Sequence, residues 1–182
     1  GEVPVETLRP GDLVLTTDGE ARPVRWLGRQ TVSTVFADPL RVLPIRIKAG
    51  ALGEALPLRD LLVSPDHALL VGGVLVHAGA LVNGLTVVRE QDVPQSFVYY
   101  HVELPDHALI LAEGVAAETF IDNVDRMAFD NWAEHGSACA ADAPLVEMDL
   151  PRAKSYRQVP RAVRQLLASR AEALCPASAQ AA

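Results

Sequence analysis

The sequence predicts an all-β fold followed by one amphipathic helix, and three observations support this prediction. Up to about residue 121, short apolar runs alternate with turn-forming residues at close intervals, a pattern typical of β-sandwiches and barrels. No stretch in that range keeps the 3.6-residue apolar period of a helix for long enough to form one. Residues 159–174, in contrast, carry apolar side chains at helical spacing, with arginines on the other face.

The first predicted elements form a hairpin. In DLVLTTDGEARPVRWLG, Asp18-Gly19 separates two apolar runs, and an Asp-Gly pair favours the tight turn of a hairpin because glycine adopts positive φ without strain. The next strand lies in PLRVLPIRIKAGALG, where Ile45 and Ile47 alternate with basic residues. This alternation predicts one face toward a core and one toward solvent.

Further strands follow at similar spacing. Gly72-Gly73 predicts a tight turn between HALLV and VLVHA. Pro105-Asp106 predicts another turn, between SFVYYHVEL and HALILAEGVAAETFI. Together with LTVVRE, these runs bring the predicted total to about nine strands.

Two of these strands begin with the same five residues. Pro-Asp-His-Ala-Leu occurs at Pro65–Leu69 and again at Pro105–Leu109. The repeat fits a duplicated, pseudo-symmetric β subdomain. It also fits two independent Pro-Asp turns, which are common. The residues alone leave both interpretations open.

Composition divides the chain into three parts. Residues 1–129 form the predicted β domain. Residues 130–158 are rich in Ala, Asp, Glu and Pro without a period, which is typical of a linker or a loosely packed segment. Residues 159–182 form the amphipathic helix, with Pro160 near its start, and a frayed tail.

Charge, apolar run length and cysteine content exclude several classes of function. The formal net charge of −7 and the pI near 5.2 provide no basic surface for nucleic acid or anionic lipid. No apolar run approaches the ~20 residues of a membrane helix, and the N-terminal stretch lacks the features of a secretory signal. Cys139 and Cys175 are too few for a disulfide framework or a four-cysteine zinc site. We therefore expect no nucleic-acid binding and no membrane insertion.

The most informative stretch is LLVSPDHALLV, residues 61–71, in which polar residues interrupt an aliphatic run. Pro65 forces Ser64 out of the helical region, so the Ser64 hydroxyl and the His67 imidazole converge only if the chain bends between them. The hydroxyl could then bind a substrate carbonyl while the imidazole, which titrates near neutrality, moves a proton. A plain Asx-type turn with a histidine at the edge of the core explains the same spacing.

Three blocks together resemble the Hint domain, the self-processing module of hedgehog C-terminal domains, inteins and bacterial intein-like proteins. These blocks are VETLRPGDLVLTTDGEARPVRWLG, DLLVSPDHALLVGGVLVHAGALVNG and YYHVELPDHALILAEGVAAETFID. The resemblance spans residues 1 to about 129 and is closest to the bacterial branch called Hint-2. It implies a horseshoe-shaped, all-β fold with pseudo-two-fold symmetry.

The resemblance also implies a mechanism. In this family an N-terminal Cys attacks the preceding carbonyl, and a second nucleophile resolves the resulting thioester. A Thr-x-x-His block activates the scissile amide, and here it matches Ser64 and His67. Inteins end their last block with His-Asn, which releases the downstream segment. This chain has Glu118-Thr119 at that place, so we do not expect splicing.

The family pattern places the Cys and a first strand ahead of the segment that begins here with Gly1. The sequence is therefore either a fragment of a longer protein or a degenerate relative. We favour the fragment, which lacks its nucleophile, and expect it to be inactive alone. Cys139 and Cys175 lie outside the matched blocks and are not substitutes for the missing thiol.

His101 and His107 are the remaining candidate catalytic residues. Either could carry a second proton or orient the scissile carbonyl. His107 is modestly favoured because it repeats His67 in the pseudo-symmetric block, whereas alternation along YYHVEL could turn His101 inward. The three histidines could together bind zinc, but their spacing has no metal-ligand specificity, and we expect no cofactor. We expect His77 to be structural and His135 to be solvated.

The predicted function is autoprocessing within a larger protein, a single-turnover reaction if the upstream Cys is present. The expected partners are the chain's own N-terminal flanking segment and, as acyl acceptor, water or a small nucleophile. The resemblance implies an exported or surface-located bacterial parent protein. The alternative is a non-catalytic Hint-fold module for interaction or display, which uses its C-terminal helix to contact a partner.

Overall fold

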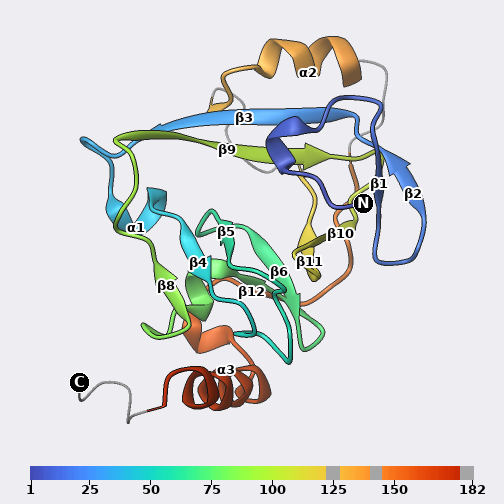
Figure 1. Ribbon diagram of the computed structural model, residues 1–182. Helices are drawn as coiled ribbons and strands as arrows, with labels where there is room; N and C mark the ends of the chain where they lie inside the picture. Colours follow the sequence, from blue (N-terminus) through green and yellow to red (C-terminus); the bar gives the residue numbers. More distant parts are fainter. Residues whose placement is uncertain (122–127, 140–144, 177–182) are drawn as a thin grey trace.

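Most of the regular secondary structure consists of β-strands. The computed structural model describes residues 1–121, 128–139 and 145–176 (Figure 1). Its strands are β1 (Leu13–Leu15), β2 (Ala21–Pro23), β3 (Trp26–Ser33), β4 (Ile45–Ile47), β5 (Leu61–Val63), β6 (Ala68–Val71), β7 (Val74–His77), β8 (Val87–Arg89), β9 (Ser96–Glu103), β10 (Leu109–Ala112), β11 (Val115–Glu118) and β12 (Arg152–Ala153). Its α-helices are α1 (Pro39–Val42), α2 (Trp132–Cys139) and α3 (Arg161–Leu174). The predicted mainly-β fold with a C-terminal helix is confirmed.

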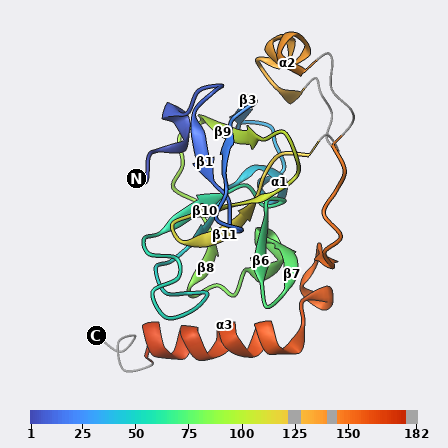
Figure 2. The same ribbon diagram turned by 90° about the vertical axis from the view of Figure 1, so that its right-hand side faces the viewer.

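The strands form four sheets. A five-stranded sheet has the order β10-β11-β6-β7-β12, a three-stranded sheet has the order β5-β4-β8, and β1 pairs with β2. β3 and β9 form a long antiparallel ribbon, in register from Trp26 opposite Glu103 to Ser33 opposite Ser96. Figures 1 and 2 show this ribbon between α2 and the five-stranded sheet, with α3 at the opposite end of the molecule.

The two predicted tight turns are present. Gly72 and Gly73, with φ of 60° and 77°, connect β6 to β7, a conformation that residues with a Cβ adopt only with strain. Asp18-Gly19 lies in the turn that connects β1 to β2. Both hairpins therefore follow from the turn residues that the sequence contains.

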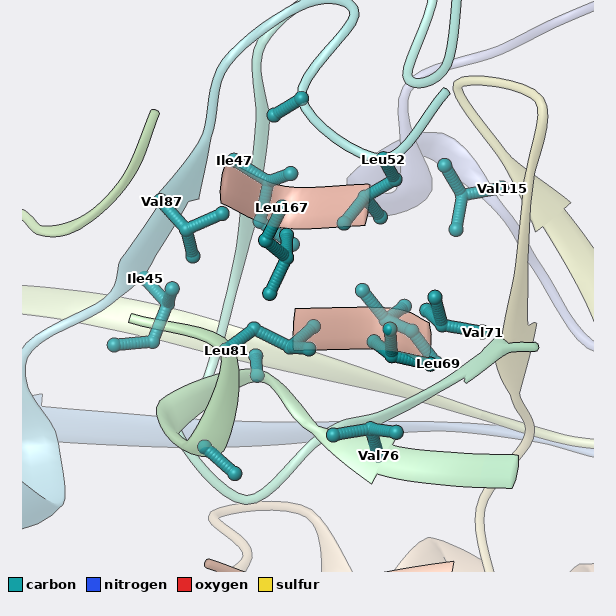
Figure 3. Packing of buried hydrophobic residues seen from close by; sticks show 14 of the residues in the cluster. Ile45, Ile47, Leu52, Leu69, Val71, Val76, Leu81, Val87, Val115 and Leu167 are labelled. Atoms are coloured by element: carbon teal, nitrogen blue, oxygen red, sulfur yellow. The ribbon is translucent and has the colours of Figure 1, made fainter. Parts of the chain in front are cut away.

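The largest core lies between the five-stranded sheet, the β5-β4-β8 sheet and α3. Figure 3 shows Leu167 of α3 reaching among Ile47, Leu52 and Leu81. Val163, Leu167 and Ala171, at helical spacing, are the buried residues of α3. Burying one such leucine stabilises the fold by about 1.5–3 kcal/mol, so the apolar face of α3 is an integral part of the domain.

The opposite face of the five-stranded sheet is covered by residues 145–153, which we name the C-terminal arm. Met148 and Leu150 of the arm pack against Ala68, Leu75 and Leu109. The arm ends in β12, which pairs in parallel with β7. Both faces of this sheet are thus buried, one by the main core and one by the arm.

An aromatic cluster lies between the β3–β9 ribbon and α2. The indole of Trp26 meets the rings of Phe120, Phe129 and Trp132 edge to face, with centroids 5.1–5.5 Å apart. A Cβ at Gly28 would stand 2.5 Å from the Trp26 ring. Glycine at this position therefore provides the space that the indole occupies.

Composition led us to expect a linker or a loosely packed segment at 130–158, and part of this range lies within the described residues. Its described parts contain α2 and β12, and its Trp132, Met148 and Leu150 side chains pack on the β domain. These few anchors are scattered among Ala, Asp and Pro without a period, which is why sequence pattern did not reveal them. In the described ranges, no helix has the length and apolar composition needed to cross a membrane.

Candidate functional site

The turn between β5 and β6 carries the Ser64–His67 stretch. The amide of His67 donates a 3.1 Å hydrogen bond to the carbonyl of Ser64. This bond closes a β-turn with Pro65 at its second position, where the fixed φ of proline is favoured. The bend that the sequence required between the hydroxyl and the imidazole is therefore present.

Neighbouring backbone holds this turn in place. The amide of Ala78 donates to the carbonyl of His67 at 2.9 Å, and the amide of Gly79 donates to the carbonyl of Pro65 at 2.8 Å. A Cβ at Gly79 would lie 3.2 Å from the Pro65 carbonyl oxygen, so glycine allows this close approach. The turn is thus fixed to the 3-10 helix that follows β7 (Ala78–Leu81).

The surroundings of His67 control its protonation. Loss of solvation lowers the pKa of His67 below its ordinary value of 6.5. The negative charge of Glu118 raises this pKa, and the positive form of His77 lowers it. His67 is therefore mainly neutral near pH 7, and its protonated form depends on Glu118 for stabilisation.

His101 of β9 is an electrostatic neighbour of His67. It lies across from Gly28 of β3, and its ring meets Phe129 and Phe120 edge to face, with centroids 5.0 and 6.1 Å away. Burial and, secondarily, the charge of His67 lower the pKa of His101 to about 4. Its buried Nε2 has no hydrogen-bond partner among the described residues. A neutral imidazole with one free nitrogen therefore lies near His67.

His107 is held in a different network. Its side chain is fully buried, its Nδ1 accepts a 2.9 Å hydrogen bond from the amide of Met148, and its Nε2 lies 2.9 Å from Glu118 Oε1. Because Nδ1 is an acceptor, the ring proton is assigned to Nε2, which faces the carboxylate. Nε2 and Oε1 are at ion-pair distance, but their angles are not those of a well-directed hydrogen bond. Both nitrogens are engaged. Of the two histidines, His101 is the one whose pKa His67 lowers, whereas His107, modestly favoured from the sequence, is bound by Met148 and faces Glu118.

Glu118 is the charged centre of that network, and sequence reasoning assigned it no role. Arg152 of β12 donates from Nη1 to Oε2 at 2.9 Å and from Nη2 to Oε1 at 2.5 Å. Burial raises the pKa of Glu118, but the hydrogen bonds from Arg152 and the close approach of His107 outweigh burial and lower that pKa to about 2. No sequence pattern connects Glu118 with Arg152, which lies 34 residues further along.

Thr119 follows Glu118 and is also buried. Its hydroxyl accepts a 3.0 Å hydrogen bond from the amide of Ala108, and its amide donates to the carbonyl of Ala108 at 3.0 Å. The side chain at this place is therefore engaged with the backbone of the neighbouring strand segment.

The other two histidines have clear structural partners. His77 Nδ1 lies 3.5 Å from Asp66 Oδ1, in agreement with the structural role expected for it. His135 was expected to be solvated, and this expectation is wrong. Its Nε2 lies 2.7 Å from Oε2 of buried Glu103, and its ring stacks on Trp132 with centroids 4.0 Å apart. Helix α2, which the sequence pattern did not predict, brings His135 there.

The described side chains form neither a metal-binding cluster nor a thiol site near the Ser64–His67 turn. Within the parts of the chain that the structure describes, no group of three or more His, Cys, Asp or Glu side chains is arranged to hold a metal ion. Cys175 is a free thiol just after α3, and helix α3 lies at the end of the molecule opposite β9 (Figure 2). The side chain of Cys139 lies outside the described residues.

Comparisons with known proteins identify the family. No curated protein and no solved structure matches the chain. A family model described as Hint domain matches residues 1–124, which is well over half of the chain. The matched region contains the Ser64–His67 turn, the β3–β9 ribbon and the His107–Glu118 network. The chain therefore belongs to the Hint domain family, as the three sequence blocks predicted.

Proposed function

We propose that this chain is the core of a self-processing domain that cleaves or transfers the segment on its N-terminal side. The Hint domain family is known for autoprocessing. The observation that carries the proposal is the Ser64–His67 turn, which backbone hydrogen bonds from Ala78 and Gly79 hold in place and which sets Ser64 and His67 just before β6. Their hydroxyl and imidazole are the groups that activation of an amide requires.

The proposed nucleophile is a Cys encoded upstream of Gly1, at the place where the family pattern has one. Its sulfur attacks the carbonyl carbon before it, a C–S bond forms, and the C–N bond of the scissile peptide breaks. The thiol proton ends on the nitrogen, which becomes a free amine. Water, a thiol, an amine or an alcohol then attacks the thioester and releases the upstream segment.

His67 has the properties of the group that moves this proton. Near pH 7 it is mainly neutral, so it can accept the thiol proton and then, as imidazolium, donate it to the leaving nitrogen. The hydroxyl of Ser64 can bind the scissile carbonyl in place of the threonine hydroxyl of the family pattern. His101, whose Nε2 has no hydrogen-bond partner within the described ranges, can orient the same carbonyl or carry a second proton. His107 would act only by supporting Glu118.

Cleavage or acyl transfer is favoured over splicing. The pair at the end of the last block is Glu118-Thr119, and neither side chain can cyclise as asparagine does. The alternative of a non-catalytic interaction module receives less support, because the apolar residues of α3 that would contact a partner are buried in the core. A helix that contributes its apolar face to its own domain is not free to dock elsewhere.

The test is the cleavage rate of the chain expressed with the residues that the DNA ahead of Gly1 encodes. We expect His67→Ala to lower the rate by roughly 10²–10⁴-fold, the usual contribution of a general acid–base group. Ser64→Ala should also reduce the rate strongly, whereas Ser64→Thr should retain it, because threonine restores the hydroxyl. Thermal unfolding of each variant controls for loss of fold.

A fully active, folded His67→Ala variant would remove His67 from the mechanism. Equal rates for Ser64→Ala and Ser64→Thr would show that the hydroxyl has no part in the reaction. If both results were found, the turn between β5 and β6 would be a structural feature only.

A further inference from the structure

Glu118 is a buried carboxylate that the proposed reaction does not yet use. Its side chain is 9% exposed and bound by Arg152 through both oxygens, and His107 Nε2 lies 2.9 Å from Oε1. A buried charge is retained only where such partners compensate for lost solvation. The structure therefore supplies two side chains from separate segments, Arg152 and His107, to keep one carboxylate ionised and in place.

Strand pairing places Glu118 opposite the residue that follows the Ser64–His67 turn. In the antiparallel register Ala117 of β11 lies opposite Leu69 of β6, so the next position places Glu118 across from Ala68, the residue that follows His67. Ala68 in turn lies opposite His77 of β7. Glu118, Ala68 and His77 thus form a row across three strands on one face of the sheet.

We propose that Glu118 is a positioning residue for His67, and that Arg152, from the C-terminal arm, holds Glu118 in its ionised form. The role in cleavage rests on the proposed function, whereas the coupling between the two side chains does not. Arg152 lies beyond the residues 1–124 matched by the family. The proposed site around His67 and Glu118 is therefore completed by a segment outside the residues that match the family.

The charges around His67 explain why it needs this partner. Three ionisable side chains from three strands influence it or are influenced by it: Glu118 from β11, His77 from β7 and His101 from β9. Burial and His77 both disfavour the imidazolium form, and Glu118 favours it. During proton transfer from thiol to nitrogen, His67 passes through this form, so Glu118 stabilises the state that the reaction requires.

Histidine NMR titration of the whole 182-residue chain tests the coupling without any cleavage. We expect the His67 titration midpoint to move to lower pH in Glu118→Gln and to stay in place in the matched control Glu147→Gln. Glu147 is the exposed partner of the same arginine, and exposed ion pairs contribute little. In Arg152→Met the titration of the Glu118 carboxyl should move to higher pH, and Arg152→Lys should largely restore it.

The same changes in the upstream-extended chain test the consequence. In Glu118→Gln the acidic limb of the pH–rate profile should move to lower pH, and the rate at neutral pH should fall roughly tenfold. An unchanged His67 midpoint in folded Glu118→Gln would overturn the inference, as would an unchanged pH–rate profile. If the midpoint moves but the extended wild-type chain never cleaves, the coupling holds and the proposed function fails. If Glu118→Gln does not fold, the Arg152→Met and Arg152→Lys titrations decide whether Arg152 holds the carboxylate ionised.

Discussion

His101 illustrates how burial determines the charge of a single residue. Its ring lies among Phe120 and Phe129, where few groups can solvate a positive charge. Burial, with a smaller effect of His67, lowers the pKa of His101 from 6.5 to about 4. In the unfolded chain the same side chain titrates at its ordinary value. Between these two pH values the unfolded state binds a proton that the folded state does not.

This difference predicts a pH dependence of stability. The contribution of His101 is fully present above pH 6.5 and is lost as the pH falls toward 4, a change of about 3 kcal/mol. His101→Phe, which keeps an aromatic ring in the cluster, should flatten the fall of unfolding free energy in this window. Denaturant unfolding of both proteins at several pH values measures it. Parallel pH curves for wild type and variant would contradict the account.

Individual site residues differed in how far the sequence could predict them. The bend at Ser64–His67 followed from Pro65 and its neighbours, because a proline restricts the backbone locally. Glu118 could not be found in the same way. Its role depends on Arg152 and on strand pairing across the sheet, which are long-range relations without a local pattern.

At the scale of elements, α3 is the clearest case in which pattern and packing agree. The spacing of apolar residues in 159–174 predicted an amphipathic helix, and the structure has α3 at Arg161–Leu174 with Val163, Leu167 and Ala171 buried. Arg170 adds a 2.7 Å hydrogen bond from Nε to the carbonyl of Gly50. Helix α2 and β12 escaped prediction because their packing depends on a few anchor residues in a polar segment.

The burial of α3 leads to a prediction about its contribution. Leu167→Ala should lower the free energy of unfolding by about 2–5 kcal/mol, since it removes a large side chain from the main core and leaves a cavity. Gln165→Ala, an exposed position on the same helix, should change it by less than about 0.5 kcal/mol. Chemical denaturation compares the two. Similar small effects for both would mean that α3 is only loosely attached.

At the scale of the whole molecule, the protein is a Hint-family β domain that is completed by segments beyond the family match. Residues 1–124 match the family, yet Trp132, Met148, Arg152 and Leu167 all contribute to clusters or networks within that domain. The all-β class and the family were both predictable, because they depend on local turns and on recognisable blocks. Among the residues after the family match, only the packing of α3 on the β domain was predictable, because its apolar side chains recur at helical spacing.

The central claim is that the Ser64–His67 turn serves an acyl shift to an upstream Cys. The most direct test is to determine the coding sequence ahead of Gly1, express the chain with the residues it encodes, and follow its intact mass with and without hydroxylamine, which attacks thioesters. We predict an encoded Cys and a hydroxylamine-accelerated loss of the upstream segment as its hydroxamate, abolished in His67→Ala. Absence of the Cys with an unchanged mass, or cleavage that persists without both the Cys and His67, would contradict the account.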